Sequence, residues 1–208
     1  MKIAVIGTGS VGRTLTDGFR RVGHEVVVGT RDPEETRARA EWADEAGLTT
    51  FAAAGDGADL VVNATGGNVS AEALAEVDLD GKVLLDVANP LDFSAGFPPT
   101  LTVKDTDSLA EQLQRAFPQA RVVKSLNTVT ASVMVDPAAL PAETTMFVAG
   151  DDADARALVR GLLAELGWVD VVEFASLDAA RGLEMWLPLW VRLMGNLGTA
   201  EFNVRLVR

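Results

Sequence analysis

The sequence predicts an α/β fold, a doubly wound and mostly parallel sheet with helices on both faces. Three observations predict it. Apolar runs rich in β-branched residues recur along the chain, as in strands that are buried on both faces. Segments with helical periodicity separate these runs. No internal repeat or linker-like composition interrupts the alternation, so the 208 residues predict a single domain, 1–208, with 175–208 as a C-terminal helical segment.

The predicted elements follow one another along the whole chain. Strands are expected at 3–6, 26–28, 49–52, 59–65, 82–87, 120–126, 144–149 and 168–174, of which the third has the weakest signal. Helices are expected at 13–22, after Asp32, at 108–117 and, capped by Gly150-Asp151-Asp152, at 153–166. The segment 92–102 is rich in Gly, Pro and Phe and predicts a long loop, either a lid or pocket wall or an inert surface loop.

Composition and charge exclude several kinds of site. The chain has no cysteine, which excludes disulfides, thiol chemistry and thiolate metal sites, and its single histidine, His24, excludes a histidine-rich metal site. The net charge of −12 disfavours nucleic acid and anionic membranes as partners. The apolar N-terminus runs directly into glycines, and no apolar run reaches membrane-spanning length, so we expect a cytoplasmic protein.

The first predicted strand passes through three glycines into a helix. Gly7 permits a backbone conformation that a side chain disfavours, Gly9 lets a pyrophosphate approach the backbone, and Gly12 lets the helix pack closely. The free N–H groups at the helix start then face the phosphates. This pattern predicts a Rossmann-type dinucleotide site, the alternative being a tight turn without a ligand. The candidate contacts at this turn are Gly7, Thr8, Gly9, Ser10, Val11 and Gly12.

The end of the second strand predicts which dinucleotide binds. Thr30 and Arg31 supply a hydroxyl and a guanidinium that suit the 2′-phosphate of NADP(H). An acidic residue here would instead favour NAD, but Asp32 and the following Pro33 also match the start of a helix with Asp32 as its N-cap. We therefore assign Asp32 to capping and expect NADP(H). Arg37, one turn into that helix, either assists or is a solvated surface arginine.

Ligands of doubly wound sheets bind beyond the carboxyl ends of the strands, at the point where the strand order reverses. The ends of the fourth and fifth strands should therefore lie beside the ribose and nicotinamide of the cofactor. His24 lies at the opposite edge, so we expect a solvated turn residue there rather than a general base. The candidate cofactor contacts at these strand ends are Ala64, Thr65, Gly66, Asn89 and Pro90.

Residues 179–204 predict a C-terminal helix that is apolar almost all round. A helix without a polar face is buried on several sides, and Pro188 should kink it. Pro188 and Arg192 argue against a membrane span. The segment is either plain core, or it closes the substrate crevice, forms a dimer interface, or does both.

The sequence offers no acid–base group for the expected site. The chain has no tyrosine, and Lys124 is the one lysine near a suitable strand end, where its side chain fits the solvent face equally well. No carboxylate pair, Ser-His-Asp set or metal cluster stands out, so we assign no catalytic residue and no metal. Hydride transfer between two cofactors needs none, because the protein has only to hold two rings face to face.

Several motifs together resemble the NADPH-dependent reductases of the deazaflavin coenzyme F420, over nearly the whole chain. They are the glycine turn, Gly29-Thr30-Arg31, Ser125-Leu126-Asn127-Thr128, Gly150-Asp151-Asp152 and the apolar C-terminal helix. The resemblance implies reversible hydride transfer between C4 of the nicotinamide and C5 of the deazaflavin. It also implies that Thr8, Ser10, Thr30 and Arg31 contact NADP(H), and that Asn89, Asn127, Thr128 and the Met194-Gly195-Asn196 segment border the deazaflavin.

One departure from the family pattern concerns Asn127, where better-known members have a histidine. Asparagine donates and accepts hydrogen bonds but does not titrate. Three hypotheses follow: a reductase of F420, a reductase of an ordinary flavin or quinone-like acceptor, and a non-catalytic NADP(H)-binding sensor. The flavin hypothesis draws on a resemblance to the reductase domain of ferric reductases. In each case we expect a homodimer formed through the C-terminal helix.

Overall fold

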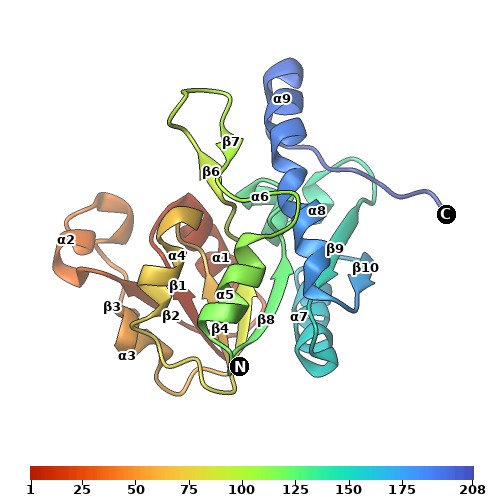
Figure 1. Ribbon diagram of the computed structural model, residues 1–208. Helices are drawn as coiled ribbons and strands as arrows, with labels where there is room; N and C mark the ends of the chain where they lie inside the picture. The colour runs from red at the N-terminus through yellow and green to blue at the C-terminus, as the bar shows by residue number, and fades with distance from the viewer.

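The computed structural model describes residues 1–208 and confirms the doubly wound, mostly parallel sheet (Figure 1). Eight strands lie in the order β10-β9-β8-β5-β4-β1-β2-β3. Every neighbouring pair is parallel except β8 and β9. The strands are β1 (Lys2–Ile6), β2 (Glu25–Thr30), β3 (Leu48–Thr50), β4 (Leu60–Asn63), β5 (Val83–Asp86), β8 (Arg121–Ser125), β9 (Thr145–Ala149) and β10 (Asp170–Phe174).

Helices cover both faces of the sheet. Successive side chains of a strand point to opposite faces, so Ile3 and Val5 of β1 join one apolar core while Ala4 and Ile6 join the other. The first core includes α1, α6 and α7, and the second includes α3, α4 and α5. The helices are α1 (Ser10–Arg21), α2 (Pro33–Arg37), α3 (Phe51–Gly55), α4 (Ser70–Leu74), α5 (Leu109–Ala116), α6 (Ala131–Val135), α7 (Ala153–Glu165), α8 (Ala180–Met185) and α9 (Leu187–Leu197).

Side-chain caps fix the starts of several helices. Asp32 accepts hydrogen bonds from the backbone N–H groups of Glu34 and Glu35, which confirms its assignment as the N-cap of α2. Asp152 accepts one from Ala155 at 2.7 Å and caps α7 as predicted. Since the Asp32 carboxylate is turned toward its own helix, it does not need to serve a ribose.

Short elements account for most differences from the prediction. The third strand ends at Thr50, because its hydroxyl accepts a hydrogen bond from Ala53 N–H and starts α3. The five-residue helices α4 and α6 are too short to show helical periodicity in the sequence. The predicted loop at 92–102 is a two-stranded hairpin of β6 (Leu91–Asp92) and β7 (Thr100–Leu101).

The C-terminal segment departs furthest from the prediction. It forms two helices rather than one, and Pro188 lies in the first turn of α9, where its missing N–H costs no hydrogen bond. The helix ends at Leu197, since Gly198 adopts a left-handed φ of 68°, and the chain is not helical from there to 208. Burial on several sides was wrong for α9, whose Leu189 is 50 % exposed. The β6–β7 hairpin and α9 both project from the edge of the sheet at which β1, β2, β4, β5 and β8 end (Figure 1).

None of the nine α-helices has both the length and the apolar character that crossing a membrane would require.

Candidate active site

The glycine turn between β1 and α1 is shaped by close backbone approaches. Gly7 has a φ of +118°, and a Cβ there would lie 2.5 Å from the carbonyl oxygen of Ala64. A Cβ at Gly12 would lie 2.1 Å from the carbonyl oxygen of Gly7. Gly9 differs, because a Cβ there would meet nothing within 4 Å. Gly7 and Gly12 are therefore required by the fold, whereas the open space over Gly9 fits a pyrophosphate held at the start of α1.

Thr8, between the first two glycines, is held by residues that follow α2. Its carbonyl oxygen accepts hydrogen bonds from Trp42 Nε1 and Arg39 Nη1, both at 3.2 Å. Its hydroxyl accepts one from Arg39 Nη2 at 2.6 Å. Sequence reasoning missed both residues, since nothing in the local pattern indicates that Arg39 and Trp42 fold back over the glycine turn.

The residues at the end of β2 have different partners. The Thr30 hydroxyl is buried and lies 2.8 Å from the hydroxyl of Thr36. Arg31 is exposed, and no hydrogen bond or ion pair within the chain engages its guanidinium. Arg37 Nη2 donates to the carbonyl oxygen of Leu48 on β3, so its head group is tied away from the glycine turn. Of the two arginines singled out in the sequence, Arg31 is the one that is free to meet a phosphate.

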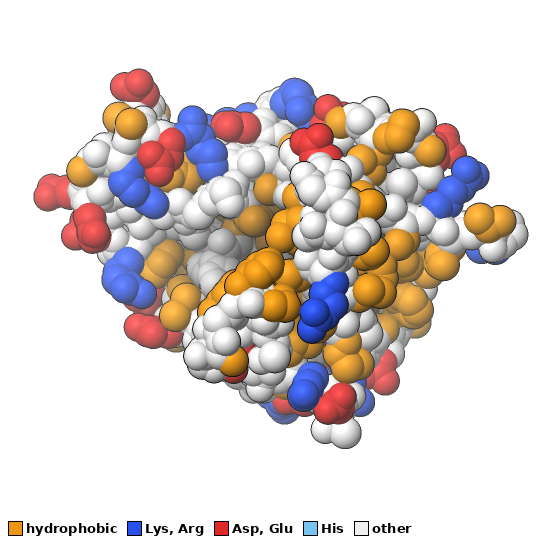
Figure 2. Space-filling model, turned by 90° about the horizontal axis from the view of Figure 1, so that it is seen from above, with side chains coloured by type: hydrophobic (Ala, Val, Ile, Leu, Met, Phe, Trp, Pro, Cys, Tyr) orange, Lys and Arg blue, Asp and Glu red, His pale blue; other side chains and the backbone are white.

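A cavity of about 330 Å³ lies at the switch point of the sheet. Figure 2 looks onto this end and shows a hollow bordered by hydrophobic side chains. Leu187 and Trp190 of α9 form part of its wall, together with Met134 of α6. The lining includes seven of the predicted site residues, Ser10, Val11, Ala64, Thr65, Gly66, Asn89 and Asn127, but no acidic, basic or histidine side chain.

Other predicted residues lie outside this cavity. Pro90 supports the hairpin, since its carbonyl oxygen accepts a hydrogen bond from Thr102 N–H at 2.9 Å. The carbonyl oxygen of Thr128 accepts one from Trp186 Nε1 at 3.2 Å. Met194 and Gly195 follow Trp190 along α9 and do not line the cavity in this chain.

His24 lies outside the site as predicted, but it is not a solvated residue. Its side chain is only 7 % exposed, and Nε2 lies 2.7 Å from a carboxylate oxygen of Glu165. The ring therefore joins the end of α7 to the start of β2, at the edge of the sheet opposite the cavity.

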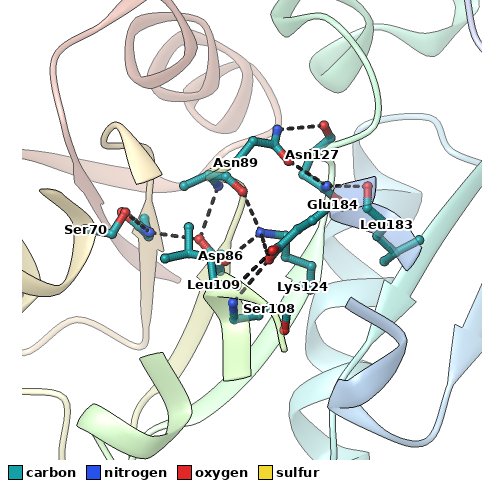
Figure 3. Close-up of polar contacts among 12 residues, drawn as sticks. Ser70, Asp86, Asn89, Ser108, Leu109, Lys124, Asn127, Leu183 and Glu184 are labelled. Atoms are coloured by element: carbon teal, nitrogen blue, oxygen red, sulfur yellow. Dashed lines mark hydrogen bonds and ion pairs between the residues drawn. The ribbon is translucent and has the colours of Figure 1, made fainter. Parts of the chain in front are cut away.

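Asn89 and Asn127 form a reciprocal amide pair on the cavity wall (Figure 3). Asn127 Nδ2 donates to Asn89 Oδ1 and to the carbonyl oxygen of Leu183, and Asn89 Nδ2 donates to the Asn127 carbonyl, all at 3.0 Å. Leu126 just before the pair has a φ of 62°, which a leucine rarely adopts. The strained turn directs Asn127 toward α8. Its Oδ1 is buried without a hydrogen-bond partner, as is Trp190 Nε1.

A fully buried ion network lies beneath this amide pair. Lys124 Nζ lies 2.7 Å from Asp86 Oδ2, 2.9 Å from Glu184 Oε1 and 2.5 Å from the carbonyl oxygen of Ala88 (Figure 3). Burial disfavours the charged ammonium, but the two carboxylates outweigh it and hold the pKa of Lys124 above its usual range. Lys124 is therefore neither solvent-facing nor open to the crevice.

The two carboxylates of this network are satisfied by further groups. Glu184 accepts hydrogen bonds from Leu109 N–H at 2.8 Å and Ala110 N–H at 3.2 Å, at the positive end of the α5 dipole. Asp86 accepts one from Asn63 Nδ2 at 2.8 Å. Burial raises the pKa of Glu184, and Lys124 opposes this shift. The network thus joins β4, β5, β8, α5 and α8 directly behind the cavity.

The comparisons with known proteins fit this geometry. A cavity that joins a dinucleotide turn to an uncharged wall places the chain among Rossmann-type, nicotinamide-dependent oxidoreductases. A profile described as NADP oxidoreductase, coenzyme F420-dependent, matches residues 2–90. The F420-dependent NADP reductase of Methanothermobacter thermautotrophicus is 30% identical over 207 residues, covering 93% of this chain and 89% of the relative. The chain belongs to the family of F420-dependent NADP reductases.

Two further proteins are similar to this chain over nearly its whole length. A crystal structure from Arthrobacter sp. FB24, provisionally assigned as an F420-dependent NADP reductase, is 52% identical, superimposes with a TM-score of 0.97 and covers 100% of both chains. The rat metalloreductase STEAP3 is 26% identical over 91% of this chain, which spans 38% of that longer protein. Sequence similarity therefore links this chain both to the F420-dependent NADP reductases and to a metalloreductase.

Proposed function

We propose that this protein transfers a hydride reversibly between NADP(H) and the deazaflavin coenzyme F420. The observation that carries the proposal is the cavity at the switch point, which has no titratable side chain in its lining. A reductase of alcohols or amines needs an acid or base at this place. Transfer between two ring systems needs close and correct placement instead. Family membership supplies the identity of the two rings.

The residues present fit a dinucleotide. The space over Gly9 admits a pyrophosphate, and Thr8, Ser10, Val11, Thr30 and Arg31 would hold the adenosine and phosphate end. The ends of β4 and β5, at Ala64, Thr65, Gly66, Asn89 and Pro90, would hold the nicotinamide end. When bound, the reduced nicotinamide supplies the hydride.

The second ring would be held from the other side of the cavity. Asn127 Oδ1 and Trp190 Nε1, one acceptor and one donor, are both buried and unpartnered. A buried polar atom without a partner is costly, so each would gain from a ligand's hydrogen bond. Thr128, Met194 and Gly195 remain proposed contacts. Because these three residues lie outside the cavity, they would contact the second ring only if the ligand extended beyond the cavity or a second subunit completed the site.

The test is a calorimetric titration with NADPH, followed by oxidised F420 into the NADPH-bound protein, and then an optical assay of deazaflavin reduction. We expect both molecules to bind and the second to be reduced. Binding of NADPH without any turnover of F420 would refute the proposed acceptor. Preferential reduction of a flavin or quinone would instead show a reductase of those acceptors. Tight NADPH binding with no transfer to any acceptor would support a sensor.

We also propose a homodimer formed through α9. Leu189 is 50 % exposed, Leu197 53 % and Met185 39 %, so the two C-terminal helices present apolar side chains to solvent in a single chain. Exposed apolar patches of this kind mark interaction surfaces. Sedimentation at micromolar concentration should give the mass of a dimer, and Leu189→Glu should shift it toward monomer. A wild-type monomer would refute the proposal.

A further inference from the structure

Arg39 contacts the dinucleotide turn although it lies outside every motif. It follows α2 and begins the 3-10 helix η1 (Ala40–Trp42). Its guanidinium donates to the Thr8 hydroxyl at 2.6 Å and to the Thr8 carbonyl at 3.2 Å. A guanidinium has five N–H donors, so these two contacts leave others available for a ligand.

Contacts made by Trp42 hold the backbone at Arg39 in place. Trp42 is buried against Val28 and Leu48 and donates its indole N–H to the same Thr8 carbonyl. Trp42 N–H in turn donates to the carbonyl oxygen of Arg39 at 2.9 Å. The short helix is thereby fastened to the glycine turn, which holds the guanidinium ready beside Thr8.

Neither Arg39 nor Arg31 has a carboxylate partner. The chain carries 30 acidic and 18 basic residues, and most of its arginines are paired with a carboxylate, as Arg20 is with Glu45 at 2.7 Å. No ion pair involves Arg31 or Arg39. An anionic ligand is thus met here by two cationic groups whose charge the protein does not neutralise.

Both arginines belong to segments that adjoin the glycine turn. Gly7 N–H donates to the carbonyl oxygen of Gly29 at 3.0 Å, which sets the end of β2 against the glycine turn. Arg31 follows Thr30 there, while Arg39 reaches Thr8 from η1. The ribose of a dinucleotide lies at this end of the turn. A phosphate monoester on that ribose is a dianion that guanidinium forks bind in two-pronged fashion.

We propose that Arg39 is the second arginine of the 2′-phosphate site and, together with Arg31, makes the protein select NADP(H) over NAD(H). The inference rests on the proposed use of NADP(H) but not on the identity of the hydride acceptor. Arg39 is a specificity residue that meets the cofactor directly, from a different segment of the chain than the Thr30-Arg31 motif.

The experiment measures the Kd values of NADPH and NADH, and of 2′,5′-ADP and 5′-AMP, for Arg39→Ala and Arg31→Ala. Arg37→Ala is the matched control, because Arg37 lies in the adjacent helix with its guanidinium tied to Leu48. We expect Arg39→Ala to weaken NADPH and 2′,5′-ADP about tenfold or more, while NADH and 5′-AMP change less than about twofold. Arg37→Ala should change none of the four more than about twofold.

Arg39→Lys separates ligand binding from support of the turn. Lysine keeps the charge but not the planar fork, so it should restore part of the NADPH affinity lost in Arg39→Ala. If Arg39→Ala weakened the binding of NADPH and NADH equally, the ratio of the two Kd values would stay unchanged. Arg39 would then only support the glycine turn, and the inference would be overturned. Wild-type protein that binds NADPH no better than NADH would overturn the inference and the proposed cofactor together. If the Kd ratios came out as expected but F420 was not turned over, only the proposed reaction would be overturned, and the inference about Arg39 would stand.

Discussion

The two halves of the site are held together in different ways. On the cofactor side, the contacts join segments that are closer together in the sequence. Asn63 Oδ1 accepts from the hydroxyl of Thr65, two residues on, at 2.7 Å, and Arg39 and Trp42 reach Thr8 across 31 and 34 residues. On the acceptor side, the contacts join distant segments. Asn127 bonds to Leu183 across 56 residues, and Leu109 bonds to Glu184 across 75. The cofactor side is thus built from strand ends and from the segment that follows α2, whereas the acceptor side exists only after α8 has docked.

The largest expected effect comes from removing the ion that fastens α8. Lys124→Met leaves Asp86 and Glu184 buried without their cation, which should lower the free energy of unfolding by about 3–5 kcal/mol. Urea denaturation measures this. Lys104→Met is the matched control, because Lys104 is exposed and has no ion pair, and it should change stability by less than about 0.5 kcal/mol.

A second variant tests whether the network acts as one unit. Adding Glu184→Gln to Lys124→Met removes one of the stranded charges, so the double variant should lose less stability than the sum of the two single losses. Strict additivity would show that Lys124 and Glu184 stabilise the fold independently, and would break the contrast between the two halves.

The next effect separates two glycines on the cofactor side. Gly12→Ala places a methyl against the Gly7 carbonyl and should cost about 1–3 kcal/mol of stability. Gly9→Ala meets no protein atom, so it should leave stability within about 0.5 kcal/mol of wild type yet raise the NADPH Kd about tenfold or more. Thermal unfolding and NADPH titration measure the two quantities.

Gly161→Ala on the exposed side of α7 is the control for both variants. Nothing lies within 4 Å of its added methyl, so stability should stay level or rise and NADPH affinity should not change. If Gly9→Ala bound NADPH as well as wild type does, the pyrophosphate would not lie over Gly9, and the cofactor side would need a different arrangement.

The smallest expected effect is on the pH dependence of thermal stability. Arg181 on α8 holds the Glu111 carboxylate on α5 by hydrogen bonds of 2.5 and 2.9 Å, which lowers the pKa of Glu111 below its ordinary value of 4.5. A lowered pKa stabilises the fold above that value, and the contribution is lost as pH falls through the lowered pKa. Glu111→Gln should therefore lower Tm at neutral pH, and this difference from wild type should shrink as the pH falls below 4.5.

Glu45→Gln provides the equivalent change among the elements that carry the glycine turn, where Arg20 of α1 lowers the pKa of Glu45 by a similar contact. Both variants should show the same pH trend in Tm, but only Glu111→Gln, which loosens α8, should raise the KM for the acceptor. A KM change in both would mean that the acceptor side is no more dependent on distant contacts than the cofactor side.

The same contrast explains what the sequence could predict. The approximate positions of the strands, the glycine turn and the capping role of Asp32 depend on residues within a few positions of one another, and these predictions hold. The contacts of Thr8 with Arg39 and Trp42 span 31 and 34 residues, so no local pattern reveals them. Lys124 shows the same limit, because whether a lysine faces water or two carboxylates is decided by which distant segments meet it.

The antiparallel pairing of β8 with β9 determines the route of the last helices. Since β10 is parallel to β9, it ends at the edge of the sheet opposite the cavity. From there α8 and α9 lead the chain back to the edge at which β8 ends (Figure 1). On the way, Glu184 contacts Lys124 and Leu183 contacts Asn127, and Leu187 and Trp190 then line the cavity. Had β9 run parallel to β8, the last helices would have descended away from the cofactor. One reversed strand pair thus brings a wall to the cavity from the helices that follow the same sheet, and turns appended to α9 would deepen that wall outward while the sheet stayed as it is.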